Sequence, residues 1–240
     1  DAATVLMLRE GDAGMEVLLL KRHTDSKDLG GAFVFPGGKR DEADASPEAL
    51  TALQQDLASL HAQLGEPDLA PHHAASLFVA ALREAQEECG LQLQATDLQA
   101  WSRWITPRMP SVTSKRFDTR FFVAVLPQNQ TPIHDDVEAV DSIWLSPRDA
   151  LLKYWERGIS MAPPQIMTLV NLLPYSDCAS VLRAALARKP SAVMPETFDA
   201  DGLRHICYPG DPQHSIKEKA MIGPTRLRFV EGRFEPKDGV

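Results

Sequence analysis

Two apolar runs near the N-terminus, residues 3–10 and 15–22, constrain the fold most strongly. Both are rich in Val, Leu and Met, and the segment Gly11-Asp12-Ala13-Gly14 lies between them. Apolar, β-leaning runs on either side of a glycine-containing turn are typical of adjacent antiparallel strands. The sequence therefore predicts that the chain opens a β-sheet.

A helical pattern replaces the strand pattern after Ser46, which can cap a helix that begins at Pro47. Leucines then recur at helical spacing up to Gly65, and they predict one amphipathic helix over residues 47–64: Leu50, Leu53, Leu57, Leu60 and Leu64. Two prolines interrupt this pattern. A second helix is expected from near Ser76 to Cys89, closed by Gly90 as a left-handed cap. Residues 45–75 are thus expected to form a helical insertion.

The second half of the chain continues the alternation of strands and helices. Aromatic and β-branched residues predict strands within residues 98–107, 116–127 and 137–145, and a Ser146 capping box predicts a helix that ends near Gly158. Helical patterns follow at 165–173 and 177–188, before a Pro- and Gly-rich tail with brief β-like segments around His205 and Leu227. We expect an α/β sandwich with a mixed sheet, a single domain over 1–240, and a helical C-terminal extension over 160–240. A boundary near residue 160 is the alternative.

Composition narrows the classes of function. The formal net charge of −8 argues against general affinity for nucleic acid, which needs a surplus of Lys and Arg. No apolar run approaches the ~18–20 residues of a membrane span. The three cysteines, Cys89, Cys178 and Cys207, form no metal-type pair and no disulfide framework. We therefore expect a cytoplasmic protein without nucleic-acid or membrane partners, and the oligomeric state stays open.

Three glutamates, Glu84, Glu87 and Glu88, share one face of the second helix because residues three and four apart are neighbours. Each like-charge pair disfavours the helix by about 0.2–0.5 kcal/mol, and only Arg83 is close enough in sequence to offset it. A bound hard cation such as Mg²⁺ would relieve the repulsion, because carboxylate oxygens are its preferred ligands. A solvated acidic face is the simpler alternative. Likewise, Phe35-Pro36-Gly37-Gly38 is either a tight turn or a place where backbone approaches a ligand closely.

Taken together, these two segments resemble the Nudix hydrolase signature, G-x5-E-x7-R-E-U-x-E-E-x-G-U, in which U is a bulky aliphatic residue. The C-terminal half fits residues 83–91, and the N-terminal half begins at Gly38. Two departures stand out. Asp44 occupies the position of the first Glu, and 38 residues, 45–82, lie between Asp44 and Arg83 where the signature has seven. An insertion at a surface loop accounts for the second, because each doubling of loop length costs only about 0.6 kcal/mol.

The resemblance implies a Nudix-type α/β/α sandwich and a set of site residues. The chain is similar to the peroxisomal coenzyme A diphosphatase group, which carries an insertion inside the same motif. It implies Mg²⁺ or Mn²⁺ bound by Glu84, Glu87 and Glu88 with the Gly37 carbonyl, and Arg83 as the residue that orients the carboxylates. Asp44 would still pair with Arg83. One of the three glutamates or a distant carboxylate would act as base, for which we choose Glu138 over its neighbours Asp135, Asp136 and Asp141.

The substrate implied is a small nucleotide diphosphate. A looser signature of coenzyme A-cleaving Nudix enzymes is partly matched around Arg22 and Lys27, which would bind phosphate. Residues 101–117 contain basic residues and tryptophans without any acidic residue, and they are the best candidate for a positive wall with Arg103, Trp104 and Arg116. A strand with outward charges and inward tryptophans is the equal alternative. Coenzyme A or acyl-coenzyme A is the leading candidate. ADP-ribose and other nucleoside diphosphate-linked compounds are the alternative, and a catalytically silent, ligand-sensing or protein-binding domain is the alternative of another class.

Overall fold

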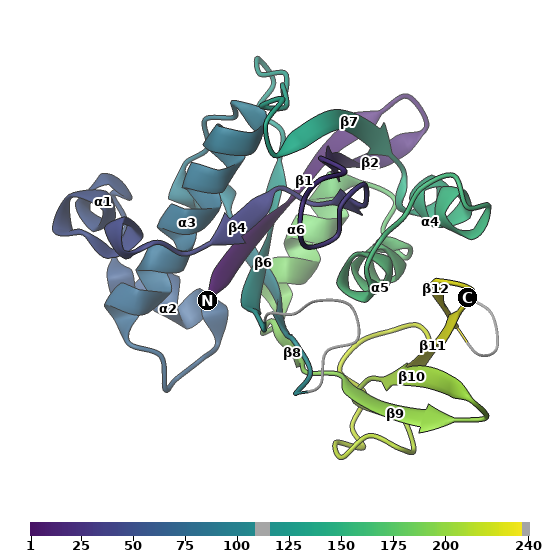
Figure 1. The fold of residues 1–240 in the computed structure, drawn as a ribbon. Coiled ribbons are helices and arrows are strands. Elements are labelled where there is room, and N and C mark those ends of the chain that lie inside the picture. The colour runs from purple at the N-terminus through teal and green to yellow at the C-terminus, as the bar shows by residue number, and fades with distance from the viewer. Residues whose placement is uncertain (109–115, 237–240) are drawn as a thin grey trace.

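A computed structural model describes residues 1–108 and 116–236, and Figure 1 shows their arrangement. The predicted opening hairpin is confirmed. Strand β1 (Ala2–Gly11) pairs antiparallel with β2 (Gly14–Arg22), with Leu8 opposite Val17 and Gly11 opposite Gly14. The apolar runs therefore form the centre of a larger sheet.

That sheet is mixed, as expected. Its main strand order is β3-β2-β1-β6-β5-β8, with β4 pairing on β1 and β7 pairing on β2. The β1–β6 and β5–β8 pairs are parallel and the other pairs are antiparallel. The remaining strands of this sheet are β3 (Phe33–Val34), β4 (Gly37–Lys39), β5 (Gln99–Ile105), β6 (Asp118–Val125), β7 (Ala139–Leu145) and β8 (Ser191–Val193).

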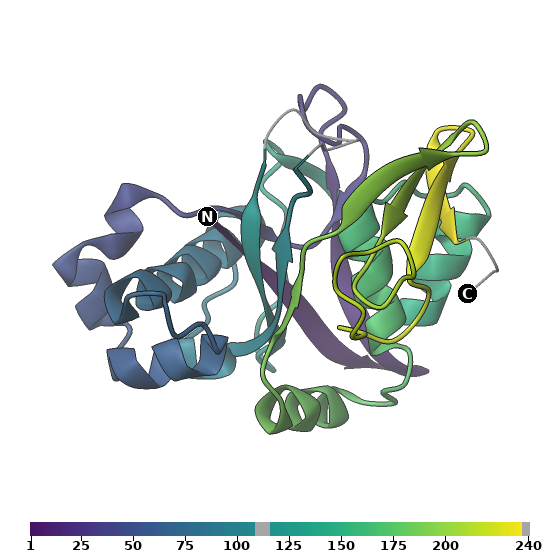
Figure 2. The same cartoon turned by 90° about the horizontal axis from the view of Figure 1, so that it is seen from below.

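Both faces of the sheet are covered, because successive side chains of β1 point to opposite faces. Val5 and Met7 pack into a cluster with the long helix α3 (Pro71–Cys89). Leu6 and Leu8 pack into a second cluster with α4 (Pro147–Trp155), α5 (Pro163–Leu172) and α6 (Cys178–Ala187). Figure 2 shows the sheet between these two helical layers. The predicted α/β/α sandwich is confirmed.

The insertion is helical, but it contains two helices where the sequence predicted one. Instead of one helix over 47–64, there are two helices, α1 (Pro47–Ala52) and α2 (Leu57–Leu64), after a short 3₁₀ turn η1 (Glu42–Ala45). Gln54 adopts a positive φ of 51° that ends the first helix, and the Asp56 side chain caps the second through Ser59 N. The leucine stripe is continuous in sequence, but this local turn chemistry breaks the helix.

The long helix α3 begins five residues before the predicted start. Pro71 occupies its first turn, where a missing N–H costs nothing. Ser76 lies inside the helix, and its hydroxyl donates to the His73 carbonyl. At the other end Gly90 adopts the predicted left-handed cap, with φ 67°. Ser146 caps α4 as predicted, although that helix ends at Trp155.

The C-terminal extension is helical only as far as Ala187. Beyond β8 the chain forms a second, antiparallel sheet in the order β12-β11-β10-β9, which lies beside α4 and α5 (Figure 1). Its strands are β9 (Glu196–Ala200), β10 (Leu203–Cys207), β11 (Arg226–Val230) and β12 (Arg233–Pro236). The sequence predicted only two of these four strands. The strands are short and contain too few alternating apolar residues to be distinguished from loop.

Two other expectations concern the whole chain. The three cysteines are free and buried, in agreement with the absence of a disulfide framework. Among the helices in residues 1–108 and 116–236, none has the length and hydropathy required to cross a bilayer.

Candidate active site

The two separated motif segments meet in the fold. Strand β4 pairs with β1, and this pairing brings the glycine turn against the C-terminal half of α3. The Gly37 N–H donates to Glu88 Oε2 at 2.8 Å, across 51 positions of sequence. The insertion therefore leaves the two halves in contact, as the resemblance requires.

The glycines of this turn are required by close packing. A Cβ on Gly37 would lie 2.4 Å from the Ala3 carbonyl, and Gly37 has a φ of 152° that side chains disfavour. A Cβ on Gly38 would lie 2.4 Å from Glu84 Oε1. The absence of a side chain at Gly38 thus leaves room for the Glu84 carboxylate against the turn.

We expect Gly38→Ala to displace the Glu84 carboxylate and to lower kcat/KM at least about tenfold, since small misplacements of a site group carry large kinetic costs. Steady-state kinetics would measure the effect. Gly158→Ala is the matched control, because a Cβ there would approach no atom closer than 3.3 Å. Equal kinetics in both variants would contradict the importance of this contact.

Arg83 joins the two motif halves from the centre of the site. Its Nε donates to Asp44 Oδ1 at 2.9 Å and its Nη2 donates to Asp44 Oδ2 at 3.1 Å, the two-point geometry of an Arg–carboxylate pair. Its Nη1 reaches Glu84 at 2.9 Å and Glu87 at 2.8 Å, and its Nη2 also reaches the Lys39 carbonyl. Asp44, although one methylene shorter than Glu, therefore makes the pair expected of it.

Burial shapes the electrostatics of the glutamates. Glu88 is 5% exposed, and burial raises its pKa to about 8, although the Gly37 N–H and the Arg22 charge oppose the shift. Burial also raises the pKa of Glu84, against the opposing effect of Arg83. Glu87, by contrast, is exposed. This face of α3 therefore carries two buried carboxylates, Glu84 and Glu88, and one exposed carboxylate, Glu87.

Glu84 and Glu87 border a cavity of about 620 Å³, whereas Glu88 lies outside its lining. Its polar end contains Gly37, Gly38, Arg83, Glu84 and Glu87. Away from the carboxylates the lining is largely apolar and comes from both sheets and the start of α5: Phe35, Ile105, Phe117, Phe121, Ala162, Pro163, Pro164, Pro195 and Ile206. Sequence reasoning missed this apolar wall, because nothing local marks residues that are brought together from six separate segments.

Glu138 also lines the cavity, whereas its competitors Asp135, Asp136 and Asp141 do not. Asp135 accepts hydrogen bonds from the backbone N–H groups of Val137, Glu138 and Ala139, and these bonds lower its pKa despite partial burial. Its carboxylate therefore shapes the turn that precedes β7 and presents Glu138 to the cavity. Glu138 thus lines the cavity, and its role as the distant carboxylate stays a prediction.

The predicted substrate-binding residues separate into two groups. Arg22 and Trp104 line the cavity. Arg22 Nε is buried without a hydrogen-bond partner among the described residues. Lys27 and Arg116 are exposed and outside the lining, and Arg116 donates to the Thr106 carbonyl. Lys115, within the basic segment, lies outside the described residues.

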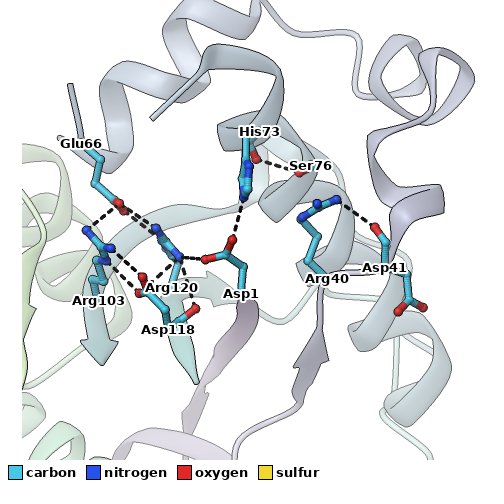
Figure 3. Close-up of polar contacts among 9 residues, drawn as sticks. All are labelled: Asp1, Arg40, Asp41, Glu66, His73, Ser76, Arg103, Asp118 and Arg120. Atoms are coloured by element: carbon cyan, nitrogen blue, oxygen red, sulfur yellow. Dashed lines mark hydrogen bonds and ion pairs between the residues drawn. The ribbon is translucent and has the colours of Figure 1, made fainter. Parts of the chain in front are cut away.

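Arg103 requires a correction. It bridges Asp118 at 2.6 Å and Glu66 at 2.8 Å, and it does not line the main cavity (Figure 3). Arg120, only 3% exposed, shares both partners and also pairs with Asp1, which in turn contacts His73. The apparent excess of positive charge in residues 101–117 is thus balanced by acidic residues elsewhere in the chain, and the predicted positive wall is wrong at Arg103.

This network ties the insertion to the sheet, because Glu66 follows α2 while Arg103 and Arg120 lie on β5 and β6. We expect Glu66→Gln to lower the free energy of unfolding by about 1–3 kcal/mol, since buried charge-assisted bonds are lost. Amide hydrogen exchange should accelerate in α2 more than in β6. Glu48→Gln, at an exposed position of the same insertion, is the control. Unchanged exchange in α2 would contradict this role for Glu66.

The carboxylates near the glycine turn supply oxygen ligands of the kind that a hard divalent cation prefers. Glu88 and Glu84 lie against Gly37 and Gly38, and Glu87 lies on the same helix face beside Arg83; carboxylate oxygens are the ligands Mg²⁺ and Mn²⁺ prefer. Arg83 engages two of these carboxylates in the structure. Within residues 1–108 and 116–236, no three His, Cys, Asp or Glu side chains form a ready-made metal site.

Comparison with known proteins agrees with this reading. Residues 87–172 match the family described as NUDT19 Nudix domain. The acyl-coenzyme A diphosphatase NUDT19 of Xenopus laevis is 25% identical over 285 positions, covering 86% of this chain and 75% of that protein. The human protein of the same name is 31% identical over 119 positions, covering 48% of this chain and 31% of that protein.

The fold has a counterpart among solved structures. The crystal structure of a NUDIX hydrolase from Alicyclobacillus acidocaldarius superposes with a TM-score of 0.59 at 23% identity, covering 79% of this chain and 96% of that one. The fold, the motif segments that meet at one cavity and the family matches lead to the same conclusion. The chain is thus similar to Nudix hydrolases, and among them to the coenzyme A diphosphatase group.

Proposed function

We propose that this Nudix diphosphatase hydrolyses the diphosphate linkage of coenzyme A or acyl-coenzyme A, with Mg²⁺ or Mn²⁺ as cofactor. The observation that carries the proposal is the two-part composition of the cavity lining. One part consists of acidic residues, Arg22 and the glycine turn, and the other part consists of apolar side chains. A substrate with a charged diphosphate and an extended, weakly polar arm matches both parts. The relatives named acyl-coenzyme A diphosphatase support the same class.

Each polar residue receives a role in this proposal. Glu84, Glu87 and Glu88, with the Gly37 carbonyl, would hold the divalent cation. Once bound, such a cation neutralises charge on the diphosphate oxygens and lowers the pKa of a coordinated water. Arg83 keeps Glu84 and Glu87 in place through its two-point pairing with Asp44.

Two further residues act on the substrate side. Arg22 binds a phosphate oxygen, because its Nε is a buried donor without a protein partner among the described residues. Glu138, the exposed carboxylate opposite, accepts a proton from the attacking water. Lys27 and Arg116 would contact the substrate only from the rim, since both are exposed outside the lining.

We also infer that residues 1–240 work as a single domain. The small C-terminal sheet contributes Ile206, and the segment before it contributes Pro195, to the same cavity that Glu84 and Glu87 border. An enzyme cut before β9 would lack part of the apolar wall.

The test is turnover of a panel of diphosphates, namely coenzyme A, an acyl-coenzyme A and ADP-ribose, each with Mg²⁺, with Mn²⁺ and with EDTA. We expect 4′-phosphopantetheine or its acyl form as product, and loss of turnover with EDTA. Mass spectrometry of the products identifies the bond that is broken. Faster release of AMP from ADP-ribose would favour the alternative substrate, and turnover that persists in EDTA would overturn the cofactor assignment.

A further inference from the structure

One group of buried polar atoms is left without hydrogen bonds beside the cavity. Among the described residues, Trp104 Nε1 on β5 has no partner, and the same holds for Gln165 Oε1 and Thr168 Oγ1 on α5. Trp104 is 5% exposed and Gln165 is 9% exposed, and both line the cavity. Buried polar atoms are normally paired, because an unsatisfied group costs about 1–3 kcal/mol. Such a group therefore needs an explanation.

The packing of these residues shows that they are held in place. Trp104 contacts Phe121 and Tyr208, with ring centroids 6.3 Å and 6.1 Å apart, so its indole is fixed between two aromatic rings. Gln165 lies in the first turn of α5, and its own N–H is already bonded to the Ala162 carbonyl. The two polar side chains thus belong to rigid elements on the cavity wall.

The chemistry of this wall is neutral. An indole N–H only donates, and a carboxamide both donates and accepts. Their neighbours in the lining include Ala162, Pro163 and Pro164. A phosphate would find no charge to bind here, whereas a neutral group with one carbonyl and one N–H would satisfy both side chains.

Resting on the proposed function, we propose that Trp104 and Gln165 form a subsite for a secondary amide of the substrate. The indole N–H donates to the amide carbonyl, and the Gln165 carbonyl accepts from the amide N–H. The pantetheine arm of coenzyme A carries two such amides next to its diphosphate, whereas the ribose of ADP-ribose carries none. The subsite would therefore select the amide-bearing arm, independently of the carboxylates that act on the diphosphate.

The direct test uses pantetheine, which has the amides but no phosphate. Its binding to the full chain in EDTA is measured by calorimetry or by ligand NMR. We expect Gln165→Met and Trp104→Phe each to weaken pantetheine binding about five- to thirtyfold, the loss of one hydrogen bond worth about 1–2 kcal/mol. In coenzyme A turnover both variants should raise KM more than they lower kcat, because a ground-state contact is lost.

Gln128→Met is the matched control, since it makes the same chemical change at an exposed glutamine outside the cavity. Thermal melts of all variants separate a loss of binding from a loss of fold. Pantetheine binding that is equal in wild type, Gln165→Met and Trp104→Phe would overturn the subsite even if coenzyme A is hydrolysed. Absence of coenzyme A turnover, together with pantetheine binding that depends on these two residues, would instead overturn the proposed function and leave the subsite standing.

Discussion

Glu88→Gln is expected to lower kcat/KM by about 10²–10⁴-fold while leaving the free energy of unfolding unchanged or slightly increased. The two effects have one cause. Glu88 is almost fully buried, and burial raises its pKa to about 8, so folding at neutral pH costs either an ionised carboxylate out of water or the uptake of a proton. Glutamine keeps an oxygen that accepts the Gly37 N–H bond and has no ionisable group.

This combination distinguishes a functional carboxylate from a structural one. A residue that stabilises the fold would lose stability on substitution, whereas a buried charge retained for function loses activity alone. Steady-state kinetics with coenzyme A and urea unfolding would measure both quantities. Glu218→Gln, at an exposed position outside the cavity, is the control for the chemical change. Activity of Glu88→Gln within about threefold of wild type would remove Glu88 from the proposed site.

Arg83→Met is expected to have the largest effect on stability, a loss of about 3 kcal/mol in the free energy of unfolding, as well as a loss of activity. Asp44 is 2% exposed, and its charge would remain buried with the Asp41 N–H as its remaining partner among the described residues. Removal of one member of a buried ion pair is costly because the other member keeps its desolvation penalty. Glu84 and Glu87 would also lose their shared donor.

The double variant Arg83→Met with Asp44→Asn tests the mechanism. Once Asp44 is neutral, the uncompensated charge is gone, so we expect the double variant to regain about 1–2 kcal/mol relative to Arg83→Met. Arg183→Met, at an exposed position of α6, should change stability by less than about 0.5 kcal/mol. Strictly additive losses in the double variant would contradict a direct Arg83–Asp44 interaction as the source of the effect.

Local patterns predicted the parts of the site that depend on neighbours in sequence. The spacing of Glu84, Glu87 and Glu88 placed all three on one turn of helix, and the Ser146 cap and the Gly90 cap were readable as single residues. The same reasoning failed at Gln54, where an apolar period continues but a positive φ breaks the helix. The spacing of the leucines indicates which face of a helix is apolar. It does not indicate whether the backbone stays helical between two leucines.

The partners of charged side chains were the feature hardest to predict from the sequence. Residues 101–117 contain no acidic side chain, yet the partners of Arg103 are Asp118, just beyond that window, and Glu66, far upstream in the insertion. An ion pair depends on distance in space, and the β5–β6 pairing and the docking of the insertion determine that distance. In the same way, Arg22 and Glu138 come to one cavity through the pairing of β2 with β7.

The sequence alone determined the helix that carries the glutamates, the glycine turn, the opening hairpin and the family resemblance, because each depends on residues a few positions apart. Tertiary structure alone decided that the Gly37 N–H bonds to Glu88 across the insertion, that Glu66 bridges Arg103 and Arg120, and that apolar residues from both sheets line the same cavity as Glu84 and Glu87. The reason is physical. Periodicity and caps act through local backbone geometry, whereas a cavity is made by surfaces that only packing brings together.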